Sequence, residues 1–285
     1  MDKVEDAHLG SLSEVQISIV GIARDVEHSL TKSVEIIERA FTDARGARFF
    51  VVESNSKDDT ARVLKQLRDS RDNFDYISLQ GLEDGMTKRT ERLALCRNTY
   101  LDYLLTLKLG SNSLVAVVDL DGVNNQLTTD AIKSCFTRSD WDVVSANQKG
   151  RYYDIWALRE DSWCPNDYLE FSRFLQDLGH SRLMAYRRSL RSKQIKIPQS
   201  AGWLPVRSAF GGLALYRPWT ISVARYAGST TDGKVVSEHV PFHEALDRAG
   251  ARMFINPTLI NAHSTEHTGS VRLLSRQFRR LFESV

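Results

Sequence analysis

The chain has 285 residues, of which 42% are hydrophobic and 26% charged, and its formal net charge at pH 7 is +2. This length can bury a substantial core in one large α/β domain or in two small ones, and no linker divides the sequence. Acidic and basic residues are mixed along nearly the whole chain, which argues against a nucleic-acid-binding surface. We therefore expect no nucleic-acid partner.

Hydropathy and cysteine content narrow the class of protein further. No apolar run approaches the roughly 18 residues that a membrane-spanning helix needs, and residues 1–14 lack the apolar segment of a signal peptide. Cys96, Cys135 and Cys164 are widely spaced and odd in number, which fits neither a disulfide framework nor a zinc site. These features predict a cytoplasmic protein with free thiols.

Strand and helix patterns alternate through the first 122 residues. Apolar, β-branched segments predict strands at 15–22, 47–52, 76–79 and 114–119. Amphipathic segments predict helices at 30–41, 61–71 and 89–107. Strands that alternate with helices at this spacing are typical of βαβ units. The sequence therefore predicts an α/β fold with a mostly parallel sheet flanked by helices.

The predicted strand at 114–119 ends in a pair of carboxylates, Asp119 and Asp121, which Gly122 follows. Side chains two apart in a strand point to the same side, and α/β proteins bind ligands at the carboxyl ends of their strands. Neighbouring like charges are costly without a compensating positive charge, and Mg²⁺ is usually held by one or two carboxylates plus substrate phosphates. The pair predicts a divalent cation that carries a phosphate; a solvated strand end is the alternative.

Basic residues gather at the start of the third predicted helix, where Lys88, Arg89, Arg92 and Arg97 bring four cations into ten positions. Guanidinium groups bind phosphate oxygens in pairs. Their helical offsets prevent them from sharing one face, and we expect Arg89 and Arg97 to contact a diphosphate. Arg24, in the loop after the first strand, is a further candidate. A solvated helix face is the alternative.

Three segments of the first half stand in an order that is more specific than any one of them. Residues 53–60 read Glu-Ser-Asn-Ser-Lys-Asp-Asp-Thr, residues 96–98 read Cys-Arg-Asn, and residues 119–121 read Asp-Leu-Asp. In this order they resemble the GT-A-fold nucleotide-sugar glycosyltransferases, with their acidic residue after the second strand, Ala-Arg-Asn helix and Asp-x-Asp motif. The nearest resemblance is to the fungal capsule-associated α-1,3-mannosyltransferases and their bacterial relatives.

This resemblance implies a Rossmann-like, GT-A-type domain that binds a nucleotide-sugar donor and a divalent cation, Mn²⁺ or Mg²⁺. It implies that Glu53 meets the base or ribose and that Asp119 and Asp121 hold the cation. The expected donor-binding residues are Ala23, Arg24, Glu53, Arg89, Arg97, Asp119, Gly211 and Gly212.

The second half of the chain predicts less regular elements. They are a loop and short helix at 124–136, a strand at 141–146, a strand or strand edge at 152–158, and an arginine-rich helical insertion at 165–196. Gly211 and Gly212 then enter an apolar strand, and a double glycine there marks close approach of a ligand or another segment. The resemblance implies that both glycines line the donor-sugar and acceptor pocket; a β-bulge is the alternative.

Glu238 stands at the front of a helix predicted at 238–246. The resemblance implies that an acidic residue at this place faces the acceptor. Glu238 is then the general base for an acceptor hydroxyl if the enzyme inverts, or a residue that positions the sugar if it retains. A helix-capping role is the alternative. In that case Asp154 becomes the expected acceptor-side carboxylate.

His263 ends the last predicted strand, at 253–263. The resemblance implies that it completes the cation site, and imidazole favours Mn²⁺ over Mg²⁺. His267 is the second candidate, and a structural histidine is the alternative. Residues 271–285 interleave leucine and phenylalanine with arginine, which predicts a short basic amphipathic helix. That helix either docks on the protein itself or lies peripherally on the inner face of an anionic membrane.

The sequence thus predicts one domain over 1–285, with a nucleotide-binding half at 1–122, an acceptor and sugar half at 123–270 and the basic helix at 271–285. The expected reaction is metal-dependent transfer of a sugar from GDP-mannose or a UDP-sugar to a hydroxyl of a glycan or lipid-linked acceptor, in polysaccharide or glycoconjugate synthesis. One alternative is a nucleotidyltransferase acting on sugar phosphates, although residues 21–24 are not the glycine-rich loop it would want. The other is an inactive glycan-binding module.

Overall fold

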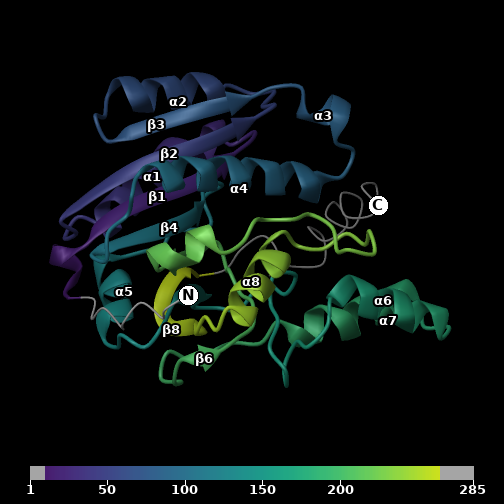
Figure 1. The fold of residues 1–285 in the computed structure, drawn as a ribbon. Coiled ribbons are helices and arrows are strands. Elements are labelled where there is room, and N and C mark those ends of the chain that lie inside the picture. The colour runs from purple at the N-terminus through teal and green to yellow at the C-terminus, as the bar shows by residue number, and fades with distance from the viewer. Residues whose placement is uncertain (1–9, 264–285) are drawn as a thin grey trace.

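The computed structural model describes residues 10–263, which form one central sheet with helices on both faces (Figure 1). The sheet has eight strands in the order β3-β2-β1-β4-β7-β5-β8-β6. The strands are β1 (Gln16–Ala23), β2 (Gly46–Ser54), β3 (Phe74–Leu79), β4 (Ser113–Asp119), β5 (Val143–Gln148), β6 (Leu204–Pro205), β7 (Leu213–Tyr216) and β8 (Met253–Ala262). The α-helices are α1 (Glu27–Ala40), α2 (Thr60–Asp69), α3 (Leu82–Gly85), α4 (Arg89–Thr106), α5 (Thr129–Lys133), α6 (Tyr168–Asp177), α7 (Arg182–Ser189) and α8 (His239–Arg248).

The first half of the sheet is parallel, as the alternation of strands and helices predicts. β1 lies between β2 and β4, and β3 continues the sheet beyond β2. The register sets Ala23 beside Glu53 and Ile22 beside Asp119. Because β1, β2 and β4 run the same way, their carboxyl ends meet at one edge, where Ala23, Glu53 and Asp119 lie.

Two apolar clusters hold this layered arrangement together. α1 and α2 pack on one face of the sheet, and buried residues such as Ile37 and Leu64 belong to the cluster on that side. α4 and α8 pack on the opposite face, where Leu101 and Phe242 are fully buried. The spacing of the apolar positions gives each helix one buried stripe, and that stripe decides which face of the sheet it covers.

The second half of the sheet contains the antiparallel strands. β7 runs antiparallel between β4 and β5, β8 is parallel to β5, and β6 is antiparallel to β8. The prediction of a mostly parallel sheet flanked by helices is therefore confirmed. The reversal of β7 has a consequence for the site, because it brings the start of β7 beside the carboxyl end of β4. There the Asp119 amide donates to the Gly212 carbonyl at 2.9 Å.

The predicted strand at 152–158 is wrong. Arg151 and Arg159 make isolated bridges to Lys196 and Ser208, and the residues between them form a turn. Tyr152 and Ile155 are both fully buried although they are three positions apart, a spacing that does not fit the two-residue period of a strand. Tertiary burial of a turn therefore produced an apolar pattern that resembled a strand.

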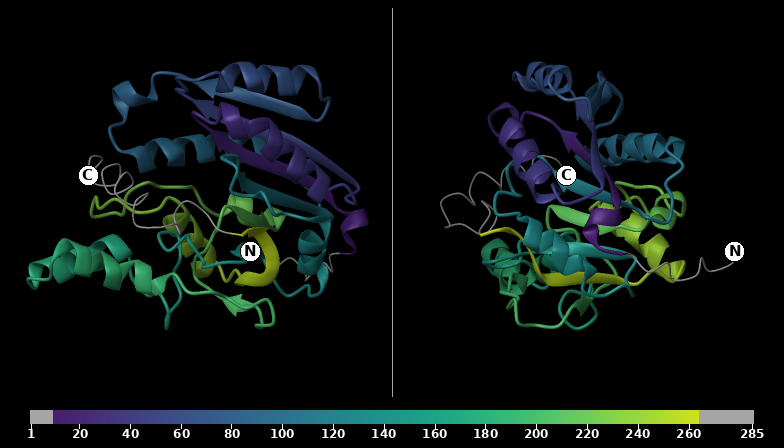
Figure 2. Two further views of the ribbon diagram at one scale, coloured as in Figure 1. Left: turned by 180° about the vertical axis from the view of Figure 1, so that it is seen from behind. Right: turned by 90° about the vertical axis from the view of Figure 1, so that its left-hand side faces the viewer.

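The predicted insertion at 165–196 forms two helices, α6 and α7, which pack against each other. Figures 1 and 2 show this pair extending away from the sheet. The predicted second metal candidate, His267, and the predicted helix at 271–285 lie outside the described residues. Within residues 10–263, the helices are all too short or too polar to cross a membrane.

Candidate functional site

The end of β4 carries a carboxyl group whose pKa is strongly shifted. Burial, followed by the neighbouring charge of Asp121, raises the pKa of Asp119 to about 8, and the guanidinium of Arg97 opposes the shift. The side chain of Asp119 still has 27% of its surface exposed. Asp154 and Glu238 also add to the negative potential at Asp119. Three neighbouring carboxylates therefore act on Asp119, which is an arrangement that favours a bound positive charge.

Arg97 reaches this acidic group from α4. Its side chain is 4% exposed, and its Nε donates to Glu238 Oε1 at 2.8 Å. Its Nη2 lies 3.6 Å from Asp119 Oδ1, and its Nη1 donates to the Tyr100 hydroxyl at 3.2 Å. The guanidinium also lies 5.2 Å from the centre of the Phe210 ring, within cation–π range. Arg97 thus links Asp119, at the end of β4, to Glu238, before α8. The expected contact of Arg97 with a diphosphate stays a prediction.

Glu238 occupies the N-cap position of α8, but within the described part of the chain its side chain makes no capping hydrogen bond there. Glu238 has only 5% of its surface exposed, and its carboxylate accepts a hydrogen bond from Arg97 instead. A buried charge without its partner is strongly unfavourable, so Glu238 and Arg97 depend on each other.

Two buried histidines follow Glu238 in α8, and the residues that contact them are distant in sequence. His243 Nδ1 lies 2.9 Å from Ser208 Oγ, and its Nε2 lies 2.8 Å from the Tyr216 hydroxyl. Burial, and then the charge of Arg97, lowers the pKa of His243 to about 3, so the imidazole is neutral. His239 stacks on the Phe210 ring at 4.0 Å between centres, and burial lowers its pKa well below the usual value.

Gly211 and Gly212 lie between Asp119 and Asp154. Both have positive φ, +70° and +87°, where L side chains are strained. A Cβ on Gly211 would meet the Ala146 carbonyl at 2.9 Å, and one on Gly212 would meet the Tyr153 hydroxyl at 2.9 Å. Both glycines are therefore required by the close approach of other segments of the protein, which is one of the two causes expected for a double glycine; the other is a ligand.

Hydrogen bonds fix this glycine segment in place. Asp154 Oδ2 accepts from the Gly211 amide at 3.0 Å, and the Gly211 carbonyl accepts from Asn261 Nδ2 at 2.7 Å. Asn124 Nδ2 donates to the Asp119 and Gly212 carbonyls at 2.8 and 3.0 Å. The carboxylate of Asp154 and the end of β4 are therefore held by one connected set of hydrogen bonds.

On the other side of β4, the loops after β1 and β2 bind each other through carboxylates and backbone amides. Asp25 Oδ1 accepts from the Lys57 amide at 2.6 Å, and Glu27 Oε2 accepts from the Asp59 amide at 2.7 Å. Asp58 Oδ2 accepts from the Glu27 amide at 3.1 Å. These reciprocal bonds satisfy loop amides that would otherwise need water, and they set the shape of the predicted nucleotide side.

Glu53 and Arg24 are engaged within these loops. Glu53 is 1% exposed, its Oε1 accepts from the Ser56 amide at 2.8 Å, and its Oε2 accepts from the Ser78 hydroxyl. Arg24 forms an ion pair with Glu83 of α3. Ala23 is buried in β1, and Arg89 is exposed in the first turn of α4. The structure thus brings Ala23, Arg24 and Glu53 to one edge of the sheet, while Arg89 stands at the start of the helix that supplies Arg97.

The expected cation ligands are only partly brought together. Asp119 and Asp121 are close enough for the charge of one to raise the pKa of the other. His263 is exposed at the end of β8, and its carbonyl accepts from the Gly150 amide at 2.7 Å. Within residues 10–263, no group of three or more His, Cys, Asp or Glu side chains is arranged to hold a metal ion. Two carboxylates fit a hard divalent cation whose other ligands are phosphate oxygens and water.

Tyr153 is a member of the site that motif reasoning missed. Burial, and then the charges of Asp119 and Asp154, raises its pKa well above the usual value, which places its hydroxyl among the carboxyl groups. The signal in the sequence was the run of aromatic residues beside Asp154. A strand over these residues would point Tyr153 and Asp154 to opposite sides, whereas the turn brings both to the site.

The sequence matches no protein-family model and no curated protein. The structure is similar to that of the mannosyltransferase PcManGT from Pyrobaculum calidifontis in complex with GDP-Man and Mn²⁺, with a TM-score of 0.52, 13% sequence identity and coverage of 95% of this chain and 63% of that chain. It is also similar to GalNAc-T7 with UDP, GalNAc and Mn²⁺, with a TM-score of 0.50, 12% identity and coverage of 92% of this chain and 48% of that chain. The chain thus spans less than two thirds of either protein. Similarity at this level concerns the fold, and the fold is the GT-A-type α/β fold that the sequence predicts.

Proposed function

We propose that this protein is a metal-dependent glycosyltransferase that moves a sugar from a nucleotide-diphosphate-sugar donor to a hydroxyl of a glycan or lipid-linked acceptor. The observation that carries the proposal is the cluster at the end of β4, where Asp119 and Asp121 lie beside the glycine segment that Asp154 holds. The resemblance to capsule mannosyltransferases puts GDP-mannose first and UDP-sugars second, and the two fold neighbours were solved with GDP-Man and with UDP.

On the donor side, Asp119 and Asp121 would hold Mn²⁺ or Mg²⁺ together with oxygens of the diphosphate. The cation, when bound, supplies Lewis-acid stabilisation of the charge on the leaving nucleoside diphosphate. A third ligand from His263 would require the exposed end of β8 to approach Asp121, since no three-residue group is preformed among the described residues. The loops after β1 and β2 would receive the nucleoside, with Glu53 fixing their shape.

On the acceptor side, a hydroxyl oxygen forms the new bond to the anomeric carbon while the bond from that carbon to the phosphate oxygen breaks. In an inverting reaction a carboxylate takes the hydroxyl proton. Glu238 and Asp154 are the two proposed candidates. Asp154 is half-buried, whereas Glu238 is 5% exposed and bonded to Arg97. An acceptor would therefore reach Asp154 more easily than Glu238. Glu238 is the candidate that also positions Arg97.

The proposal extends to organisation and setting. We assign nucleotide binding to residues 1–122 and sugar and acceptor binding to 123–270, because β4 ends at the boundary between them. A cytoplasmic location and a role in polysaccharide or glycoconjugate synthesis follow from the sequence and complete the proposal.

Donor hydrolysis tests this function against its alternatives. With Mn²⁺ and GDP-mannose or a UDP-sugar, a glycosyltransferase slowly releases free sugar and nucleoside diphosphate. Pyrophosphate release from a nucleoside triphosphate and a sugar phosphate would identify a nucleotidyltransferase instead. A thermal-shift panel selects the donor first, because a ligand at 100 times its dissociation constant adds about 2.7 kcal/mol to stability. Absence of both reactions and of any thermal shift would favour a glycan-binding module.

A further inference from the structure

Exposed apolar side chains concentrate in one part of the molecule. The exposed large hydrophobic residues of the described chain are Ile77, Leu105, Phe174, Leu178, Leu183, Met184 and Ile195. Five of these seven lie between residues 174 and 195, on α6, on α7 and in the segments beside them. Leu178 is 63% exposed and Phe174 is 55% exposed. Single exposed apolar residues need no explanation, but a concentration of this kind marks an interaction surface.

Helical spacing aligns these residues with one another and with arginines. Phe174 and Leu178 are four positions apart and share one side of α6, while Leu175, between them, is buried. On α7, Leu183 is four positions from Arg187, and Met184 is four positions from Arg188. Each exposed apolar side chain of α7 therefore has an exposed guanidinium one turn away.

The same segment carries a strong positive charge. Residues 171–196 contain seven Lys or Arg residues and one Asp, a net charge of +6, in a chain whose formal net charge is +2. The rest of the sequence is thus acidic overall. A segment that combines exposed leucine, phenylalanine and methionine with arginines has the composition of surfaces that lie in the interface of an anionic bilayer.

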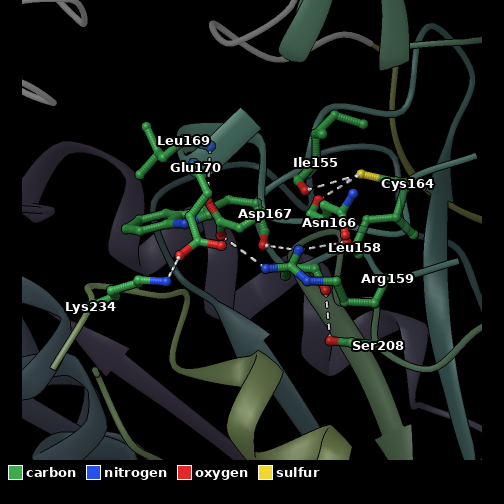
Figure 3. Close-up of polar contacts among 12 residues, drawn as sticks. Ile155, Leu158, Arg159, Cys164, Asn166, Asp167, Leu169, Glu170, Ser208 and Lys234 are labelled. Carbon is green, nitrogen blue, oxygen red and sulfur yellow. Dashed lines mark hydrogen bonds and ion pairs between the residues drawn. The ribbon is translucent and has the colours of Figure 1, made fainter. Parts of the chain in front are cut away.

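The helix pair is anchored firmly at its base, as Figure 3 shows. Asp167 caps α6 by accepting from the Leu169 amide at 2.8 Å, and it pairs with Arg159 Nη2 at 2.9 Å. The Arg159 amide in turn donates to the Ser208 carbonyl at 2.8 Å. Both Arg159 and Asp167 are buried. Lys234 adds an ion pair to Glu170 at 2.9 Å. The direction of the helix pair relative to the sheet is therefore fixed by the segments that follow Asp154 and precede Gly211.

We propose that the α6–α7 pair is a docking surface for an anionic phospholipid bilayer. The pair extends away from the sheet in Figure 1 and in the left view of Figure 2, which leaves it free to meet a flat surface. Leucine and phenylalanine enter the acyl boundary, and the arginines meet the phosphate groups of the lipids. This inference concerns binding and holds whatever reaction the site performs.

Vesicle co-sedimentation of the full chain tests the proposal. We expect binding to vesicles of equal parts phosphatidylcholine and phosphatidylglycerol, little binding to phosphatidylcholine alone, and weakening as salt is raised. The double variant Leu178→Ser/Leu183→Ser should lower the partition coefficient about tenfold or more, because two exposed apolar side chains that the bilayer would bury are lost. Arg187→Glu/Arg188→Glu should reduce binding to a similar degree while leaving the apolar residues in place.

Two controls separate this surface from others. Leu105→Ser removes a leucine of α4 that is 49% exposed, close to the 54% of Leu183, and should leave vesicle binding unchanged. Deletion of 271–285 tests the basic tail, and binding should persist without it. Wild-type affinity in both double variants would overturn the proposal, as would loss of binding on deleting the tail alone. A dimer that the α6–α7 variants dissociate, in a protein that ignores vesicles, would also overturn it and identify a self-association surface.

Discussion

The carboxylates along the edge of the sheet fall into two groups with different partners. Beside β1 and β2, the acidic side chains accept hydrogen bonds from loop amides, as Asp25 does from Lys57 and Glu53 does from Ser56. At and beyond the end of β4, Asp119 and Glu238 both contact the guanidinium of Arg97, and the charge of Asp121 raises the pKa of Asp119. The first group is hydrogen-bonded by backbone amides, whereas the second has more carboxylates than the one guanidinium beside them.

This difference teaches which residues shape the site and which act in it. A carboxylate that is satisfied by backbone amides fixes the shape of a loop. A carboxylate in an acidic cluster can take up a proton or a cation. We therefore expect substitutions beyond β4 to affect turnover, and substitutions beside β1 and β2 to affect stability and nucleotide affinity.

The largest effect should come from Asp154 and Glu238, the carboxylates proposed to face the acceptor. We expect Asp154→Asn to lower turnover by about 10²- to 10⁴-fold with donor affinity retained, which is the usual cost of a lost general base. Glu238→Gln is the matched variant, since it keeps size and hydrogen bonding. The comparison is made by steady-state kinetics beside calorimetric donor affinity. If Glu238→Gln carries the larger loss of turnover at unchanged stability, Glu238 is the base and Asp154 only positions the glycine segment.

Arg97 tests whether the buried charges depend on each other. Arg97→Met should lower the free energy of unfolding by about 3 to 5 kcal/mol, because it leaves Glu238 buried without its partner. Adding Glu238→Gln should recover part of that loss. Urea denaturation measures both, and Arg89→Met on the exposed start of α4 should change stability by less than about 0.5 kcal/mol. Equal effects of Arg97→Met and Arg89→Met would contradict the linking role of Arg97.

Glu53 provides the corresponding test beside β2. Glu53→Ala strands the Ser56 amide and the Ser78 hydroxyl, so we expect a stability loss of about 1 to 3 kcal/mol. Affinity for the free nucleoside diphosphate and for the sugar donor should fall together, because the nucleoside side of the site loses its shape. Asp72→Ala, on an exposed neighbouring loop, serves as the control. Unchanged nucleotide affinity by calorimetry would remove Glu53 from the nucleotide site.

His243 gives the most specific effect, because it appears as a pH dependence of stability. Its folded pKa of about 3 lies below the ordinary value near 6.5, so the unfolded chain binds a proton first as the pH falls. Stability from this group is complete above pH 6.5 and is lost as the pH falls toward 3, by about 1.4 kcal/mol per pH unit. His243→Gln should flatten that slope in urea denaturation, whereas His28→Gln at an exposed position should not. An unchanged slope in His243→Gln would mean that the histidine does not stay neutral.

The parts of the fold that could be predicted from the sequence rest on local signals. The apolar run before Asp119 has the two-residue period of a strand, and the double glycine at 211–212 marks a close approach whatever its cause. Helix patterns in the first half gave α1, α2 and α4 to within a few residues. The strand predicted at 152–158 is wrong, because the apolar residues there are buried by the packing of a turn and not by the two-residue period of a strand.

The partners within the site could not be predicted, because they are distant in sequence. Arg97 and Glu238 are 141 positions apart, and their pairing depends on how α4 and α8 pack on one face of the sheet. His243, enclosed by Ser208 and Tyr216, is a similar case. Motif reasoning could name Arg97 and Glu238 as functional candidates, but only the packing shows that they bind each other.

Calorimetric titration of GDP and UDP tests the central claim most directly. The claim is that Asp119 and Asp121 bind a nucleoside diphosphate through a shared divalent cation. We predict that the wild type binds one of the two nucleotides on the order of 10²-fold more tightly with Mn²⁺ than with EDTA. Asp121→Ala should show the weaker affinity in both conditions, while Asp130→Ala, an exposed carboxylate on α5, should behave as the wild type. Equal affinity of the wild type with Mn²⁺ and with EDTA, or a normal Mn²⁺ effect in Asp121→Ala, would contradict the account.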